Sequence, residues 1–355
     1  PGSGSPSARR AAPRRPSPAS QPPESWRKDV EAELVRNILP FWIENVVDPS
    51  GGFFGALTND LAVHDEVPRS GVVCARILWT YAAAYRRFGR PEYLSMAQHA
   101  FVYLAGPFWD RQHGGIYWQI DAQGQPVSAR KHSYAQAFAI YGLAEYHLAT
   151  GDGQSLALAQ KLFALLERYA HDAVNGGYIE GCGPAWDALV DMRLSDKEPN
   201  CRKSMNTLLH ILEGYSNLLR TWDDPLLRSR LRELLGIFLD RVLEDNTHRF
   251  RLFFDDTWHP LPDHISYGHD IEGSWLLVEA AELLHDPVYL EQVRTEAVAM
   301  ALAVYTSGLQ ADGSVLYERR ADGSVDNAKH WWAQAEGVVG FYNAYQLSGD
   351  DRLLA

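Results

Sequence analysis

The sequence repeats itself with a period of about 62 residues, and this repeat limits the folds open to the chain. A Gly-Gly pair at 51–52 recurs at 114–115 and again at 176–177, in steps of 63 and 62 residues. The segments that begin at Arg249 and Asp312 continue the series, 63 residues apart. A fixed period of this length is typical of an architecture that uses one structural unit many times over.

Each period is predicted to hold two helices and one short hairpin. The second helix of a pair is apolar nearly all round, as in 205–212, which indicates burial on both sides. The first helices, such as 226–243, carry more charged residues and are predicted to form an outer layer. Apolar residues recur at helical spacing in ten segments, which are 30–43, 72–85, 93–108, 134–148, 156–169, 205–219, 226–243, 271–284, 288–305 and 331–347.

Buried inner helices paired with amphipathic outer helices predict an all-α fold, a closed ring of helical hairpins or (α/α)6 barrel. An open solenoid is the alternative, but it would expose one face of the aromatic inner helices. Six pairs close such a ring and the sequence supplies five, so we expect a barrel truncated after about ten helices. Residues 1–24 are rich in Pro, Ser and Arg and are expected to be a disordered tail. Residues 25–355 are expected to be the barrel catalytic domain, incomplete at its C-terminus.

Composition removes several classes of function. The 355 residues include 33 Lys+Arg against 45 Asp+Glu, a net charge of −12, which disfavours nucleic acid and anionic membranes as partners. No apolar run approaches the roughly 20 residues of a membrane helix. The three cysteines form no CxxC, which favours a reducing, cytoplasmic location without structural zinc. No GxGxxG, P-loop or GxSxG motif occurs in the sequence. We expect neither a metal nor a cofactor. We also expect the protein to be a monomer or a homodimer.

Several polar and aromatic residues lie at similar distances before the helix breakers that end the inner helices. This placement predicts that they meet at one mouth of the ring, where free helix N–H groups also face a ligand. A polar side chain on a buried helix needs a partner or a cavity. The residues are Arg76, Tyr134, His210, His269 and Trp332.

Two His-x-x-Glu motifs stand among these residues. His210 is followed by Glu213, and His269 by Glu272, which places each pair on one helix face. A carboxylate beside an imidazole fixes its tautomer and raises its pKa towards values useful to a general base. The alternative for one such pair is a core histidine with an internal hydrogen bond, and a metal site lacks a third ligand at the right spacing. Two pairs at one mouth favour a catalytic function.

Carboxylates and tryptophans at the same mouth leave a second chemistry open. A glycosidase on this fold needs two carboxyl groups across the sugar, and Glu198, Glu272 and Glu336 are candidates. Trp331 and Trp332 follow Lys329 and His330, and a tryptophan pair there is either core or a platform for a sugar ring.

Three segments together resemble the cellobiose 2-epimerases of the N-acylglucosamine 2-epimerase superfamily. They are 203–210 (KSMNTLLH), 266–277 (SYGHDIEGSWLL) and 329–336 (KHWWAQAE), and 75–80 and 131–134 are similar as well. The resemblance extends over about 25–355 and implies an (α/α)6 barrel. It also implies an enzyme that needs no metal or nucleotide and inverts C2 of the reducing-end glucose of β-1,4-linked disaccharides.

The resemblance implies a role for each candidate. His269 is implied as the general acid/base at C2 with Glu272 supporting it, and His210 and Arg76 as the groups at the C1 and C2 oxygens. The implied substrate-binding residues are Tyr134, Asn206, Glu198, Trp258, Trp331, Trp332 and Glu336, although Glu198 stands where Asp is expected. The family returns the proton with a further His in a Trp-Lys-x-Pro-Tyr-His segment, which this sequence does not contain.

The chemistry fits these residue types. A positioned base removes the proton α to a carbonyl group, and nearby groups stabilise the oxyanion that develops. In this reaction the resulting intermediate is a cis-enediolate. Three alternatives to a cellobiose 2-epimerase stay open. They are an N-acylglucosamine 2-epimerase or mannose isomerase, a non-catalytic sugar-binding remnant, and an (α/α)-barrel glycosidase.

Overall fold

The chain folds into an all-α ring of helical hairpins, in agreement with the predicted barrel. The computed structural model describes residues 24–196, 198–262 and 264–354. The predicted tail therefore lies outside the described residues, except for Glu24, which begins α1. Within the described residues, no helix is long and apolar enough to cross a membrane.

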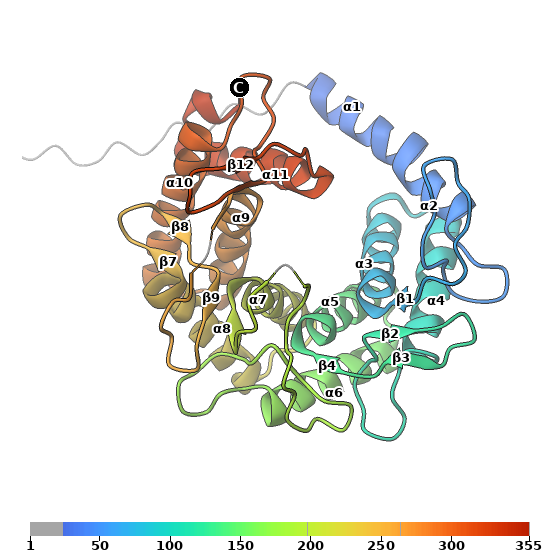
Figure 1. Ribbon diagram of the computed structural model, residues 1–355. Coiled ribbons are helices and arrows are strands. Elements are labelled where there is room, and N and C mark those ends of the chain that lie inside the picture. The colour runs from blue at the N-terminus through green and yellow to red at the C-terminus, as the bar shows by residue number, and fades with distance from the viewer. Residues whose placement is uncertain (1–23, 197, 263, 355) are drawn as a thin grey trace, which may run out of the picture.

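Five inner helices line the ring, and the outer helices wrap around them (Figure 1). The inner helices are α3 (Gly71–Phe88), α5 (Ser133–Thr150), α7 (Met205–Leu219), α9 (Tyr267–Leu284) and α11 (Trp331–Ser348). The outer helices are α1 (Glu24–Glu33) with η1 (Leu34–Ile38) and α2 (Leu39–Asn45), α4 (Pro91–Ala105), α6 (Gly153–Tyr169), α8 (Pro225–Ile237) with η2 (Phe238–Val242), and α10 (Pro287–Ser307). All ten predicted helices are confirmed, and a short 3-10 helix, η3 (Asp351–Leu354), follows α11.

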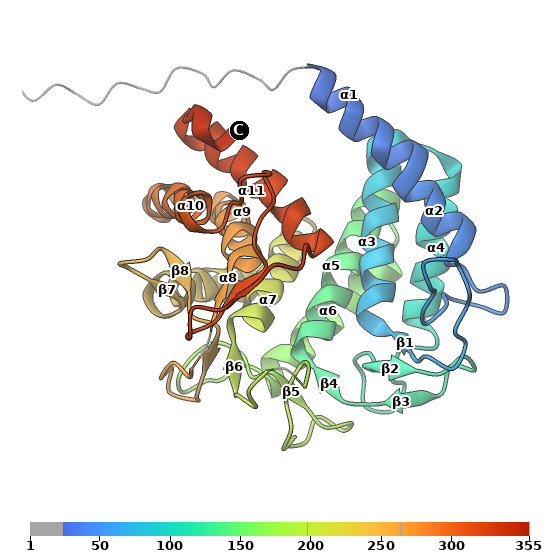
Figure 2. The same cartoon turned by 45° about the horizontal axis from the view of Figure 1, so that its top comes forward.

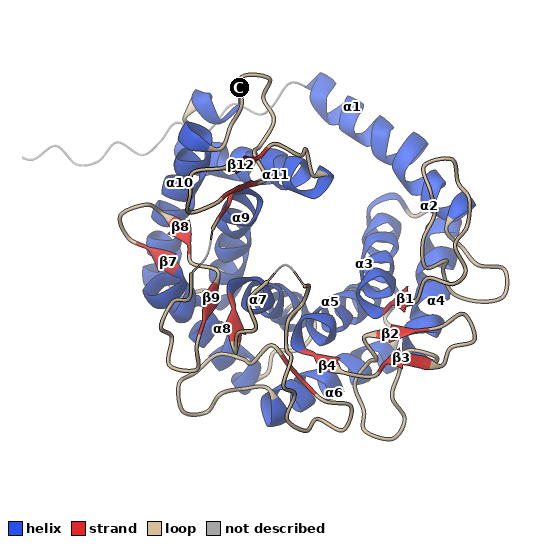
Figure 3. Ribbon diagram, viewed as in Figure 1, coloured by secondary structure: helices blue, strands red, loops and turns tan. Residues whose placement is uncertain are grey.

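Short strands gather at one end of the ring, where every inner helix begins (Figures 2 and 3). The strand that leads into an inner helix pairs with a strand of the following repeat, so neighbouring repeats are tied at this end. The antiparallel pairs are β1 (Arg69–Ser70) with β2 (Gln119–Ile120), β4 (Lys131–His132) with β5 (Gly181–Cys182), β6 (Lys203–Ser204) with β9 (Phe253–Phe254), and β10 (Ile265–Ser266) with β11 (Glu318–Arg319). The others are β2 with β3 (Pro126–Ser128), β7 (Leu243–Glu244) with β8 (Arg249–Phe250), and β11 with β12 (Val325–Asp326).

A repeated ion pair explains the 62-residue period at the level of side chains. In four of the repeats an aspartate opens the hairpin, and its carboxylate pairs with a cation just before the next inner helix. The distance is 2.7 Å for Asp48 to Arg69, for Asp110 to Lys131 and for Asp172 to Lys203. Asp312 meets Lys329 in the same way. This ion pair attaches the hairpin to the start of the inner helix. It thereby stabilises the end of the ring where the candidate site lies.

Close contact between inner helices completes the wall of the ring. A Cβ added to Gly142 would lie 2.6 Å from the carbonyl oxygen of Ala75, and one on Gly214 would lie 2.7 Å from that of Ala137. A Cβ on Gly340 would lie 2.5 Å from the carbonyl oxygen of Ile271. These glycines let neighbouring inner helices approach backbone to backbone, which narrows the ring around its axis.

Candidate active site

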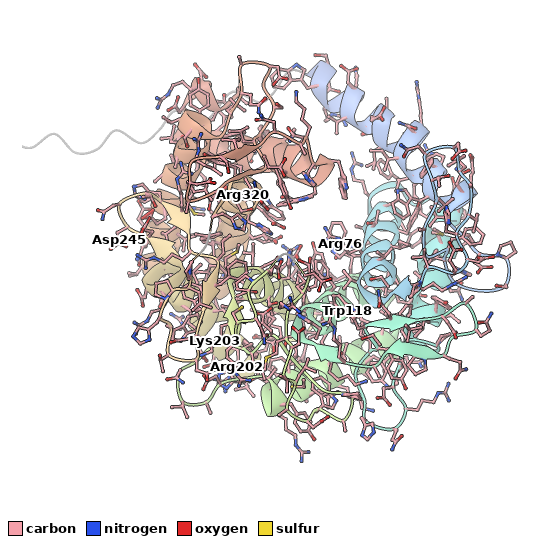
Figure 4. All side chains as sticks on the ribbon, viewed as in Figure 1. Arg76, Trp118, Arg202, Lys203, Asp245 and Arg320 are labelled. Atoms are coloured by element: carbon pink, nitrogen blue, oxygen red, sulfur yellow. The ribbon has the colours of Figure 1, made fainter. Side chains whose placement is uncertain are left out.

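The structure brings the predicted residues of the mouth together. The ring of Tyr134 lies edge-on to that of His210, with centroids 5.0 Å apart, and the ring of His269 lies 4.8 Å from that of Trp332. Arg76 points from α3 towards the middle of the ring (Figure 4), with its guanidinium 4.6 Å from the centre of the Phe138 ring. Residues from five inner helices therefore face one space.

His210 is held by its own helix and by α5. Its Nδ1 lies 2.8 Å from Oε2 of Glu213, as the first His-x-x-Glu motif predicts. The Phe138 ring covers the imidazole with centroids 4.6 Å apart. Burial lowers the pKa of His210, and the Glu213 carboxylate offsets this only in part. The expected rise of this pKa is therefore wrong, because desolvation of the imidazolium outweighs the neighbouring carboxylate.

Glu272 does not support His269 in the way the resemblance implies. Its Oε1 lies 4.0 Å from Nε2 of His210, across the interface between α9 and α7. His269 instead shares a 2.7 Å hydrogen bond between its Nδ1 and Oγ of Ser266, the residue that precedes α9. The three-residue spacing gives a common helix face, but the neighbouring helix decides which imidazole the carboxyl group meets.

His269 is a neutral imidazole at neutral pH. Burial, and to a smaller extent the neighbouring imidazoles of His210 and His264, lower its pKa to about 3. When Nδ1 donates its proton to Ser266, Nε2 carries the lone pair that a base needs. The structure thus gives His269 the free base form, although its pKa lies far from the value expected of a general base near neutral pH.

Three carboxyl groups of the site, those of Glu272, Glu336 and Glu198, have pKa values above their ordinary range. Burial, Glu336 and Glu213 raise the pKa of Glu272 well above its usual value, and Arg76 offsets this only in part. Burial also raises the pKa of Glu336, whose Oε2 accepts a 2.8 Å hydrogen bond from Nε1 of Trp275. Burial raises the pKa of Glu198 as well. A protonated carboxyl group donates as well as accepts, which suits a ligand rich in hydroxyl groups.

Three of the predicted sugar-binding residues differ in their surroundings. Asn206 lies near the start of α7, and its Oδ1 is buried without a hydrogen-bond partner in the described structure. Trp331 is 76% exposed. Trp258 donates its indole N–H to the carbonyl oxygen of Asn175 at 2.8 Å and lies under the ammonium group of Lys203, 4.5 Å from the ring centre. Its contacts hold a hairpin together, so the location of Trp258 favours packing over sugar binding, and its sugar contact stays a prediction.

Sequence reasoning missed Ser266, Phe138 and Trp275 as parts of the site. Ser266 stands three residues before His269, where a residue ahead of a helix often bonds the first turn, so a local signal was present. Phe138 follows Tyr134 by one helical turn and resembles an ordinary core residue in the sequence. No group of three or more His, Cys, Asp or Glu that could hold a metal ion occurs within the described ranges.

The sequence profile of the N-acylglucosamine 2-epimerase family matches residues 52–355. The chain belongs to this family. A cellobiose 2-epimerase from Bacteroides fragilis is 43% identical over 329 residues, covering 92% of this chain and 84% of the relative. The solved structure of a cellobiose 2-epimerase from Bacillus thermoamylovorans superposes with a TM-score of 0.88 at 36% identity, covering 93% of this chain and 84% of that one.

Other relatives and structural neighbours are less similar to the chain. A D-mannose isomerase from Marinomonas mediterranea and an N-acylglucosamine 2-epimerase from Bos taurus are each 23% identical to the chain, which covers 80% and 78% of them. A family 76 α-mannanase from Bacteroides thetaiotaomicron has a TM-score of 0.61 at 15% identity, covering 92% of this chain and 81% of that one. That likeness shows the fold alone.

Proposed function

We propose that the chain is a cellobiose 2-epimerase that inverts C2 of the reducing-end glucose of a β-1,4-linked disaccharide. The observation that carries the proposal is a pair of imidazoles, the buried His210 and the half-buried His269, which face one space together with Arg76. The 43% identity to a cellobiose 2-epimerase supports this substrate over those of the relatives at 23% identity.

The geometry supports a different catalytic role for each of the two histidines. His269, with Ser266 on Nδ1, presents Nε2 as the base that takes the proton from C2. His210, with Glu213 on Nδ1, faces the oxygens at C1 and C2 together with Arg76 and Glu272, whose pKa is raised by burial. Positive charge and acidic hydrogen-bond donors stabilise the cis-enediolate as negative charge moves onto oxygen. Rotation of the planar intermediate then presents the opposite face of C2 to protonated His269, and return of the proton to that face gives the mannose epimer.

The remaining binding roles belong to the same proposal. We assign contacts with the sugar hydroxyls and ring faces to Tyr134, Asn206, Glu198, Glu336 and Trp332. Trp258 and Trp331 are assigned to the margin of the binding site. The buried and unpartnered Oδ1 of Asn206 supports a ligand contact at that position. We infer a cytoplasmic monomer or homodimer, and the three buried free cysteines are consistent with a reducing location.

Product analysis after incubation with cellobiose tests the proposal. Glucosyl-mannose is the expected product. Free glucose would show a glycosidase that uses pairs among Glu198, Glu272 and Glu336. Binding of cellobiose without any product would show a sugar-binding protein without this activity. N-Acetylglucosamine and mannose serve as competing substrates, and faster conversion of either would assign the chain to the other branches of the family.

A further inference from the structure

A line of polar side chains continues from His210 along the axis of the ring, away from the mouth. On α7 and its C-cap it consists of His210, Glu213, Asn217 and the C-cap residue Arg220, which recur at helical spacing on one face. On α5 it consists of Tyr141 and Glu145, one and two turns beyond Phe138. Ten residues separate His210 from Arg220, so the line extends over about 15 Å of helix. Of these residues, the catalytic chemistry proposed at the mouth uses His210 and Glu213 and none of the others.

Close contacts connect the upper part of this line. Glu213 lies 2.8 Å from Nδ1 of His210 with one oxygen, and its carboxyl group is also close enough to the Tyr141 hydroxyl to raise the pKa of that tyrosine. Asn217 donates to the carbonyl oxygen of Tyr141 at 3.0 Å and to Oε2 of Glu145 at 3.2 Å. Glu145 in turn accepts a 2.5 Å hydrogen bond from Arg86. Polar contacts therefore extend from the imidazole of His210 to Arg86, although not every step is a side-chain hydrogen bond.

The lower part of the line opens into a cavity that is separate from the candidate active site and is called the second cavity here. This cavity has a volume of about 400 Å³, and its walls include Tyr141, Glu145, Asn217, Arg220 and Glu279. Charged groups dominate these walls, and Arg220 pairs with Glu279 at the rim. A polar cavity of this size holds water, because each water finds several hydrogen-bond partners there.

The protonation states along the line suit the transfer of a proton. Burial and the nearby Glu213 and Glu279 raise the pKa of Tyr141 well above its usual value, so its hydroxyl keeps its proton and donates it. Burial raises the pKa of Glu279, so this carboxyl group exchanges protons closer to neutral pH than an exposed glutamate does. Each group along the line can accept a proton from the preceding group while it releases a proton to the next one.

We propose that Glu213 and Tyr141 form a proton path that connects His210 with water in the second cavity at the far end of the ring. When Nε2 of His210 takes a proton from a sugar hydroxyl, Nδ1 passes its own proton to Glu213. Glu213 passes a proton to the oxygen of Tyr141 as the hydroxyl proton of Tyr141 moves to a cavity water, and Glu279 buffers that water. The reverse sequence returns the proton. No bond other than those to hydrogen changes, and no electron transfer is involved.

The path serves the reaction only if the chain has the proposed function. A disaccharide bound at the mouth separates His210 from solvent on that side, so a route through the back of the site lets the imidazole exchange its proton while substrate is bound. The groups facing His210 are Glu213 on its own helix, Tyr134 on α5, Arg76 on α3 and Glu272 on α9. Of these, only Glu213 has a described contact that leads away from the mouth.

Replacement of Tyr141 by Phe removes the hydroxyl group and keeps the ring, which stacks on Trp79 with centroids 5.0 Å apart. Tyr215 offers a matched control, because its buried hydroxyl also donates to a glutamate, Glu167 at 3.0 Å, and lies off the path. With cellobiose, Tyr141→Phe is expected to lower kcat about tenfold with KM within about twofold, since general acid–base transfer contributes at least this much. Tyr215→Phe is expected to leave kcat unchanged.

A second readout does not depend on turnover. The exchange of the His210 Nδ1 proton with water is followed by NMR on protein with labelled histidine, saturated with cellobiose. Tyr141→Phe and Glu279→Gln are each expected to slow this exchange at least several-fold relative to the wild type and to Tyr215→Phe. Loss of epimerisation in the wild type would reject the proposed function and leave this test intact. Equal exchange rates in the wild type, Tyr141→Phe and Glu279→Gln, or equal slowing in Tyr215→Phe, would overturn the path.

Discussion

Glu180 is a buried carboxyl group that forms no ion pair with any of the residues that the structure describes. It accepts hydrogen bonds of 2.8 Å from the backbone N–H of Ser204 and from the hydroxyl of Thr207, and so caps the start of α7. Burial raises its pKa to about 7. The helix that carries Asn206 and His210 is thus held by a group that titrates near neutral pH.

This titration makes the stability of the protein depend on pH. Between the ordinary value of 4.5 and about 7, folded Glu180 keeps its proton while unfolded Glu180 loses it. The free energy of unfolding therefore falls as pH rises through this interval, by about 3 kcal/mol at most for this group. Glu180→Gln is expected to flatten the dependence of stability between pH 5 and 7.5, measured by urea unfolding. The control Glu44→Gln, on the exposed face of α2, should retain the slope, and an equal slope in Glu180→Gln would contradict the account.

Individual residues also show where sequence reasoning reaches its limit. Spacing along one helix correctly predicted the pairing of His210 with Glu213. It did not predict that Glu272 meets His210 rather than His269, because that contact depends on how α9 lies against α7. The pKa of His210 was predicted in the wrong direction, since the extent of burial follows from packing by Phe138 on another helix.

The inner helices depend on glycines at their contacts. Gly214 faces the backbone of α5, and a Cβ there would lie 2.7 Å from the carbonyl oxygen of Ala137. Contacts this short force the two helices apart, at a cost of about 1–3 kcal/mol. Alanine also favours a helix by about 1 kcal/mol relative to glycine, so the two effects oppose each other.

Gly214→Ala is expected to destabilise the protein by about 1–2 kcal/mol, because a rigid backbone carbonyl is the obstacle. Chemical unfolding gives the measurement. Gly153→Ala at the start of α6 is the matched control, since no atom lies within 4 Å of a Cβ added there, and it should leave stability equal or slightly higher. A stabilised Gly214→Ala would show that helix propensity decides at this contact.

Helices were the best-predicted elements, for a physical reason. Apolar periodicity and helix-ending residues such as Gly89 and Gly151 are local signals, and the structure ends α3 and α5 at these left-handed glycines. The pairing of strands between repeats was not predicted, because strands of two residues carry no pattern that a sequence can display. The repeated aspartate–cation pairs were likewise visible only after folding.

The ring as a whole was predictable from the repeat, since buried inner helices leave few ways to pack five hairpins. Between α1 and α11 the ring is open (Figure 1), and a cavity of about 1280 Å³ lies along this opening. Trp26, Val30, Val338 and Val339 line it, with 47, 64, 69 and 45% of their surfaces exposed. An apolar surface of this kind favours association with other apolar surfaces.

The chain is therefore expected to self-associate as its concentration rises, measured by sedimentation velocity. Val338→Glu should weaken the association because it places a charge in the opening. Val174→Glu, at a hairpin site that is 90% exposed, should leave it unchanged. A wild type that stays monomeric across the concentration range would contradict the prediction.

The central claim is that His269 moves the proton at C2 of a disaccharide. Its most direct test is the incorporation of deuterium from D2O into C2 of cellobiose, compared between the wild type and His269→Asn. The account predicts deuterium at C2 together with glucosyl-mannose for the wild type, and at least a hundredfold loss of both for His269→Asn. Exchange at C2 that is unchanged in His269→Asn would contradict it.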